Sequence, residues 1–78
     1  MNRSIERYNE LHMNTENFIV HLKLTMKKNG LNQLETAKLL GVRQSQVSNW
    51  LHGKSMPGFY SLLKLKEKLG LAIDKIFN

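Results

Sequence analysis

The strongest constraint in this sequence is a glycine between two short stretches of helical periodicity. In the segment QLETAKLLGVRQSQVSNWLHGK, apolar residues recur at helical spacing on both sides of a three-residue break that starts at Gly41. A connection this short forces the two helices to cross steeply. Ala37 precedes the break and is small enough for the helix after the break to pass over it. Gly41 tolerates a positive φ because it has no β-carbon. The sequence therefore predicts two helices, 33–40 and 44–51, joined by a tight turn.

The second of these helices has two different faces. Four apolar residues are expected to close the wedge between the helices: Leu40, Val42, Val47 and Trp50. The outward face carries short, neutral, hydrogen-bonding side chains: Gln44, Ser45, Ser48 and Asn49, with Gln46 at its edge. Gln and Asn can bind the edge of adenine through two hydrogen bonds, and Ser reaches several bases. Short side chains also let a helix sit deep in the major groove, so this face is suited to reading bases.

The charge of the chain is positive and unevenly distributed. The 78 residues include 12 Lys and Arg against 6 Asp and Glu, which gives a net charge of +6. Residues 1–22 are slightly acidic, so the excess of positive charge lies in residues 23–78. A small basic domain is attracted to polyanions such as nucleic acid or an anionic membrane surface. The basic residues around the polar helix are candidates for contacts with DNA phosphates: Lys38, Arg43 and Lys54, with Lys27 and Lys28 as further candidates.

The rest of the chain also has helical periodicity, and no segment alternates like a strand. Residues 15–28 predict a first helix that ends at Gly30, and Asn32 with Glu35 predicts a capping box for the helix at 33–40. A further helix is expected to begin with Pro57 in its first turn, with a buried stripe of Phe59, Leu62, Leu65 and Leu69. A last short helix is expected at 72–77, with Ile73, Ile76 and Phe77 packed on the core.

The domain is expected to span residues 14–78 as a single all-α unit. Residues 1–13 fit either an arm or a short extra helix. The run Lys64, Lys66 and Lys68 is interpreted as a solvated helix face.

Residues 18–77 resemble the Cro/C1-type helix-turn-helix family of phage repressors and bacterial regulators. The matching residues are Gln33, Ala37, Leu40, Gly41, Val42, Gln44, Val47, Trp50, Gly53 and Pro57. The resemblance implies a compact five-helix, lambda-repressor-like fold that binds specific double-stranded DNA sequences and regulates transcription. It implies that Gln33 contacts a phosphate and that Gln44 touches both base and backbone. It further implies base contacts by Ser45, Ser48 and Asn49, and a phosphate contact by Lys54; we add Gln46 to the phosphate candidates.

Three residues depart from the family pattern. Arg43 stands where Ser or Thr often caps the recognition helix, so that side-chain cap is expected to be missing. Thr36 occupies a position that is usually apolar, and its methyl group is expected to be sufficient for packing at that position. Leu51 replaces a frequent Glu and is expected to leave an apolar side chain exposed.

Several classes of function lack support in the sequence. The chain has no cysteine, and His12, His21 and His52 lack the spacing of a metal site, so no metal or cofactor is expected. No nucleophile elbow, phosphate-binding glycine loop or pair of carboxylates points to an enzyme. No apolar run has the length of a membrane span, and residues 1–14 lack the pattern of a signal peptide. A cytoplasmic location in a bacterium or a phage-infected host is expected.

The leading hypothesis is a phage- or prophage-type repressor that binds a pseudo-palindromic operator as a homodimer. The alternatives are an antitoxin that binds its own operator and a toxin, and a protein-interaction module that has lost DNA binding. A dimer contact is expected from one of three sources, because no separate oligomerisation domain fits in the chain. These are the C-terminal residues Ile73, Ile76 and Phe77, the N-terminal residues Ile5, Tyr8 and Leu11, or pairing induced by the DNA.

Overall fold

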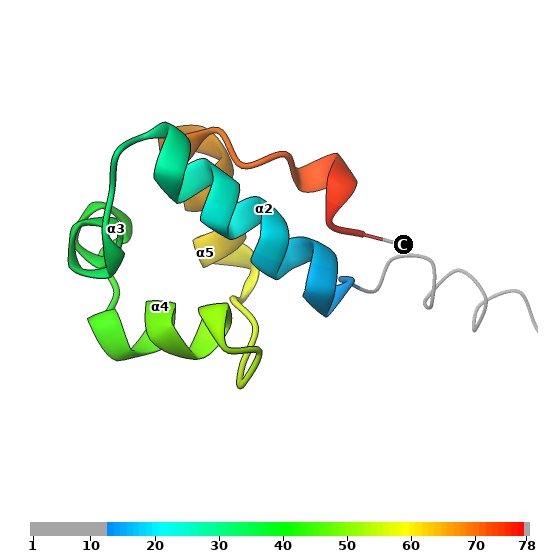
Figure 1. The fold of residues 1–78 in the computed structure, drawn as a ribbon, viewed down its shortest axis with the longest axis horizontal. Helices are drawn as coiled ribbons and strands as arrows, with labels where there is room; N and C mark the ends of the chain where they lie inside the picture. The colour runs from blue at the N-terminus through cyan, green and yellow to red at the C-terminus, as the bar shows by residue number, and fades with distance from the viewer. Residues whose placement is uncertain (1–12, 78) are drawn as a thin grey trace, which may run out of the picture.

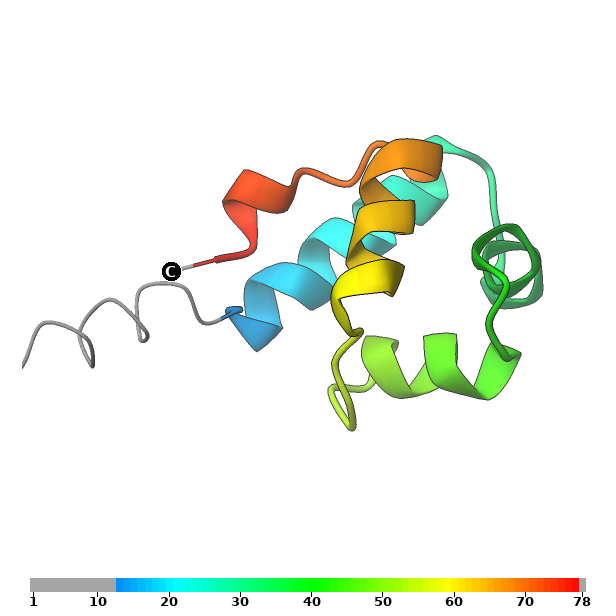
Figure 2. The same cartoon turned by 180° about the vertical axis from the view of Figure 1, so that it is seen from behind.

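The computed structural model describes residues 13–77, which form an all-helical domain (Figures 1 and 2). The expected all-α class is confirmed. Among the described residues, the only β-type pairing is an isolated bridge between Met13 and Phe77. The elements follow in the order α2 (Thr15–Lys28), α3 (Gln33–Leu40), α4 (Gln44–Leu51), α5 (Phe59–Lys64), the π-helical turn η1 (Leu65–Leu69) and the 3₁₀ turn η2 (Ile73–Lys75).

Local capping signals determine where α2 and α3 begin. The side chain of Asn14 accepts a hydrogen bond from the Asn17 backbone N–H at 3.0 Å and so caps α2. At the start of α3, the Asn32 side chain accepts from the Glu35 N–H at 2.8 Å, while Glu35 accepts from the Asn32 N–H at 2.9 Å. This is the predicted capping box, and it satisfies two backbone donors at once.

The helix-turn-helix has the geometry that the sequence predicts. Gly41 ends α3 with φ +70°, and the Val42 N–H returns to the Ala37 carbonyl at 3.0 Å. In Figure 1, α3 is seen nearly end-on while α4 runs across the view, so the two helices cross steeply. Ala37 of α3 is 1% exposed, as expected for a small residue that allows a second helix to approach closely.

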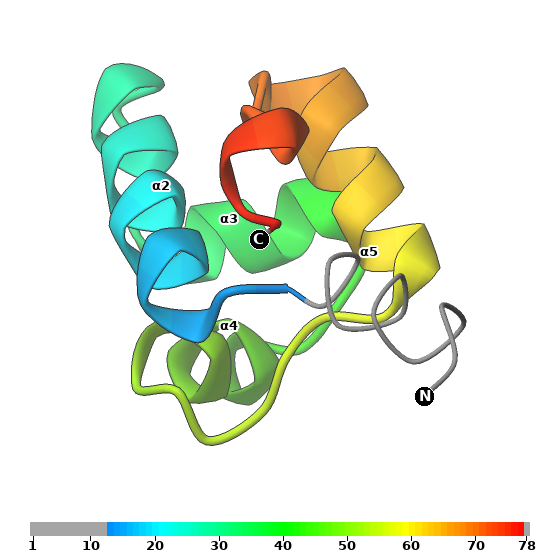
Figure 3. The same cartoon turned by 90° about the vertical axis from the view of Figure 1, so that its right-hand side faces the viewer.

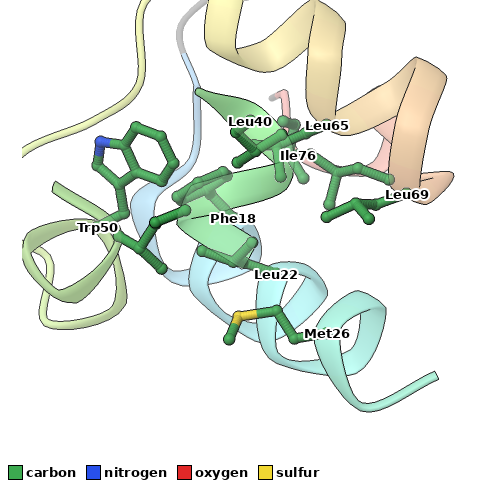
Figure 4. Packing of buried hydrophobic residues seen from close by; sticks show 11 residues of the cluster. Phe18, Leu22, Met26, Leu40, Trp50, Leu65, Leu69 and Ile76 are labelled. Carbon is green, nitrogen blue, oxygen red and sulfur yellow. The ribbon is translucent and has the colours of Figure 1, made fainter. Parts of the chain in front are cut away.

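The core lies between α2, α3, α4 and η1 (Figure 4). Phe18 of α2 and Trp50 of α4 face each other across it, and the indole nitrogen of Trp50 points away from the cluster. Thr36 is completely buried, and its hydroxyl donates to the Asn32 carbonyl at 2.8 Å, so it brings no unsatisfied polar group into the core. The buried apolar residues are Phe18, Leu22, Met26, Ala37, Leu40, Val47, Trp50, Leu65, Leu69, Leu71 and Ile76.

The prediction for α5 was partly wrong. Pro57 precedes the helix, Gly58 is its N-cap, and Phe59 is 74% exposed rather than buried. Phe59 and Leu65 are six residues apart, which rotates them by roughly 120° around a helix of about 3.6 residues per turn. Since Leu65 points into the core, Phe59 points away from it.

The expected helix at 72–77 is also different, because residues 73–75 form only the 3₁₀ turn η2. Ile76 is fully buried as expected, whereas Ile73 and Phe77 are only partly buried. The described ends of the chain lie together, since the Asn14 N–H donates to the Ile76 carbonyl at 2.7 Å. Full burial of Ile76 leaves Ile73 and Phe77 as the C-terminal candidates for a dimer contact, and the N-terminal candidates Ile5, Tyr8 and Leu11 lie outside the described residues.

Candidate nucleic-acid interface

The two faces of α4 differ sharply in burial. Val47 and Trp50 are 0% and 2% exposed, and they pack the helix against the core. The polar side chains occupy the other side: Gln44, Ser45, Gln46 and Asn49 are exposed, and Ser48 is half-buried. In Figure 1, the eight-residue helix runs along the lower side of the domain. A ligand can therefore approach the polar face of α4 without displacing any part of the described chain.

At the start of α4, Gln46 supplies one half of a capping box, while the half that an N-cap side chain would supply is missing at Arg43. The Arg43 side chain makes no capping hydrogen bond, as expected, because a guanidinium carries only donors. Instead, the Arg43 backbone N–H donates to the Gln46 Oε1 at 3.1 Å. The Gln46 carbonyl oxygen is thus occupied, and its NH₂ group is the part suited to an external acceptor. A Gln three residues after the N-cap is a signal from which this cap could have been predicted.

At the other end of α4, His52 folds back onto the helix. Its Nδ1 lies 2.8 Å from the Ser48 carbonyl oxygen and 3.5 Å from the Ser48 hydroxyl. The contact with the carbonyl requires a proton on Nδ1, because a carbonyl oxygen only accepts. His52 therefore closes the C-terminal end of α4 and lies next to one of the expected base-reading residues, Ser48.

Lys54 is held in place by the turn that follows α4. Gly53 has φ +71°, and the Lys54 N–H donates to the Asn49 carbonyl at 2.9 Å. A β-carbon at Gly53 would lie 3.5 Å from Ile19 of α2, so this turn packs closely against α2. The exposed Lys54 side chain thus projects from an ordered turn directly beyond the polar face.

Some of the other phosphate candidates come together at the start of α3. An open groove of about 360 Å³ is lined by Lys23, Met26, Lys27, Leu31, Asn32, Gln33 and Leu51. The groove brings Gln33 close to Lys27, while Lys38 lies in the last turn of the same helix as Gln33. Leu51 was expected to be exposed, but it is half-buried, because it packs against the core beside this groove.

Two lysines of the run interpreted as a solvated face have another role. Lys64 Nζ donates to the Leu40 carbonyl at 3.1 Å, and Lys68 Nζ donates to the Leu39 carbonyl at 3.1 Å. Both carbonyls lie in the last turn of α3, where helices leave backbone acceptors unsatisfied. The two ammonium groups therefore stabilise the end of α3 immediately before the turn. Nothing in the local sequence pattern indicates this pairing, because the partners are 24 and 29 residues apart.

Comparison with known proteins agrees with this geometry. A family model described as helix-turn-helix matches residues 22–76. A crystal structure of a transcriptional regulator from Listeria innocua superimposes with a TM-score of 0.67 at 28% sequence identity, covering 77% of this chain. This chain spans only 56% of that regulator's length. No curated protein sequence matches the chain. Within residues 13–77, no helix is both long and apolar enough to cross a membrane.

Proposed function

Because the chain belongs to the Cro/C1-type helix-turn-helix family, we propose that it is a transcriptional regulator that binds specific sequences of double-stranded DNA. One observation carries the proposal: α4 buries Val47 and Trp50 while it exposes a continuous face of short polar side chains. A helix anchored on one side and polar on the other can enter the major groove as a rigid unit. The similar Listeria innocua protein is a transcriptional regulator, which supports this proposal.

We assign base recognition to four residues of α4: Gln44, Ser45, Ser48 and Asn49. Gln44 and Asn49 are exposed amides and can each bind the N6 and N7 edge of an adenine through two hydrogen bonds. Ser48 is half-buried and lies beside His52, so its hydroxyl is less accessible than the two amides. We expect the amide side chains to contribute most of the discrimination between bases.

Phosphate contacts are assigned to the residues around this face: Gln33, Lys38, Arg43, Gln46 and Lys54. Arg43 and Gln46 lie at the start of α4 and Lys54 follows its end, so contacts there would hold both ends of the helix against the DNA backbone. Contacts with phosphates fix the position of the protein and make its affinity depend on salt, whereas base contacts supply specificity.

A single helix of this length reads only a few base pairs. Two copies on half-sites about 34 Å apart, one helical turn of DNA, would multiply the specificity. We therefore propose that the protein binds a pseudo-palindromic operator as a dimer. Within the regulators, we propose the phage or prophage repressor type, which the Cro/C1-type family includes. The antitoxin and the interaction module are the alternatives that the experiment below separates.

The proposal is tested by selecting DNA from a random library with the purified protein at about 150 mM salt, where non-specific binding is weak. Enrichment of a palindrome with half-sites one turn apart supports a dimeric operator-binding protein. Enrichment that appears only when a co-encoded partner protein is present favours the antitoxin. No enrichment, together with weak binding that salt abolishes, contradicts the proposal and favours an interaction module.

A further inference from the structure

An apolar groove lies outside the helix-turn-helix, between α5, the start of η1 and the C-terminal turn η2. It has a volume of about 230 Å³. For comparison, a cavity of about 150 Å³ accommodates a benzene ring. In Figure 3, η2 lies between α2 and α5, on the side of the domain away from α4. The lining residues are Phe59, Leu62, Leu63, Lys66, Ile73 and Phe77.

This groove lacks an apolar partner within the described part of the chain. Phe59 is 74% exposed and lines the groove together with four other apolar side chains. Leu62, Leu63, Ile73 and Phe77 are only partly buried. A single exposed apolar side chain is common on protein surfaces, whereas contiguous apolar side chains around a groove are typical of surfaces that bind a ligand or another polypeptide segment.

The path of the backbone indicates which segment is near the groove. Met13 pairs with Phe77, and the Asn14 N–H donates to the Ile76 carbonyl at 2.7 Å. Phe77 is itself one of the lining residues. The chain preceding Met13 therefore joins the domain at the edge of the groove. Twelve residues in helical conformation reach about 18 Å, enough to extend along α5.

The sequence of this N-terminal segment, residues 1–12, has a composition that fits an apolar groove. Ile5, Tyr8 and Leu11 are three residues apart and fall on one side of a helix. The charged residues lie mostly elsewhere and balance each other: Arg3, Glu6, Arg7 and Glu10. A segment with balanced charge can approach the basic remainder of the chain without net repulsion.

We propose that the N-terminal segment forms an amphipathic helix that docks Ile5, Tyr8 and Leu11 into the groove of its own chain. The same chain is favoured over a second copy because Met13, which directly follows the segment, pairs with Phe77 at the edge of the groove. A short connection of this kind gives an effective concentration in the millimolar range. The inference is independent of DNA binding and concerns a different face of the domain.

The test uses the full chain and a spin label at one engineered cysteine. The protein has no natural cysteine, so Asn9→Cys provides a single labelling site. The nitroxide broadens methyl signals of nearby side chains, and reducing it restores them. We expect loss of the Leu62, Leu63 and Ile73 methyl signals in the oxidised sample. The methyl signals of Leu34 and Val47, which belong to α3 and α4, should remain.

Two variants of the labelled chain test the apolar contact. Ile5→Ser/Tyr8→Ser/Leu11→Ser should restore the groove signals, because the segment loses its apolar side. Arg3→Ser/Glu6→Ser is the matched control; it keeps the net charge and the apolar side, and the groove signals should still be lost. If the triple variant retained the loss, the assignment of these three residues would be overturned.

A mixed sample separates the same chain from a second copy. Labelled protein without isotopes is mixed with isotope-enriched protein without the label, so that only contacts between copies cause broadening. Retained groove signals in this sample support docking within one chain. Their loss would overturn the same-chain assignment and show exchange between copies. The proposal as a whole fails if the singly labelled chain shows no loss at the groove while the other methyl signals match the unlabelled protein.

Discussion

Lys64 Nζ of α5 lies 3.1 Å from the carbonyl oxygen of Leu40, the last residue of α3. This hydrogen bond connects a helix outside the helix-turn-helix to the point where its first helix ends. Gly41 follows at once, and a β-carbon placed there would lie 3.5 Å from the same ammonium group. The turn between α3 and α4 is therefore supported from the outside as well as by its own glycine.

Replacing Lys64 should weaken the domain without touching α4. Lys64→Met removes a charge-assisted hydrogen bond, and because the side chain is only partly buried we expect a loss of about 1 kcal/mol in the free energy of unfolding. Urea denaturation followed by circular dichroism measures the change. Lys66→Met is the control on the same segment, since Lys66 is exposed. Equal stability of both variants would show that the bond to Leu40 contributes nothing.

Glycine at position 41 should be required by the backbone itself. Its φ of +70° is unfavourable for a residue with a β-carbon, so Gly41→Ala should cost about 1–2 kcal/mol of stability. Thermal unfolding is the measurement. Gly58→Ala is a suitable comparison, because Gly58 has φ −77° and no heavy atom within 4 Å of an added β-carbon. A larger loss at Gly58 than at Gly41 would contradict this account of the turn.

Replacing Asn32 should lower stability, whereas replacing Asn49 should lower the affinity for DNA. Asn32→Ala breaks the capping box of α3 and should lower the free energy of unfolding by about 1 kcal/mol. Asn49→Ala removes an exposed amide from α4 and should leave stability nearly unchanged while it weakens operator binding. Denaturation and fluorescence anisotropy, carried out on both variants, compare the two effects. A fall in stability for Asn49→Ala similar to that of Asn32→Ala would mean that Asn49 has a structural role.

Gln44 should affect the choice of sequence. Loss of its base contact in Gln44→Ala should cost about 1–3 kcal/mol on the selected operator and relax the preference at one or two base pairs. Affinity for DNA of unrelated sequence should stay nearly the same. Competition binding against operators substituted at each position provides the measurement. If all sequences lost affinity equally, Gln44 would be a phosphate contact instead.

Lys54 should behave in the opposite way. Lys54→Ala should weaken binding to every DNA sequence and reduce the slope of log affinity against log salt by about one. Titrations at several salt concentrations measure this slope. Lys75→Ala is the matched control, because Lys75 is an exposed lysine in η2, away from α4. A similar reduction for Lys75 would indicate only a general effect of net charge.

The helix-turn-helix could be predicted from the sequence because its determinants are local. The capping box joins Asn32 and Glu35, and Gly41 ends α3 through its own backbone geometry. The bounds of α3 and α4 follow from such short-range signals and from apolar periodicity. The polar face of α4 could be predicted in the same way, since Val47 and Trp50 define the buried side and leave the remaining residues opposite.

The tertiary structure decided what depends on distant residues. Lys64 and Lys68 bind α3, and the Asn29 side chain donates to the Leu69 carbonyl at 3.0 Å, across 40 residues. Phe59 belongs to the apolar pattern of α5 but is exposed. Leu65 faces the core, and Phe59 lies on a different side of the same helical segment. Periodicity shows which residues share a side of a helix, whereas the packing of that helix against the others decides which part of the side is buried. Local hydrogen bonds therefore determined the polar helix α4 and the turn before it, and long-range packing determined the contacts that support them and the groove that remains open.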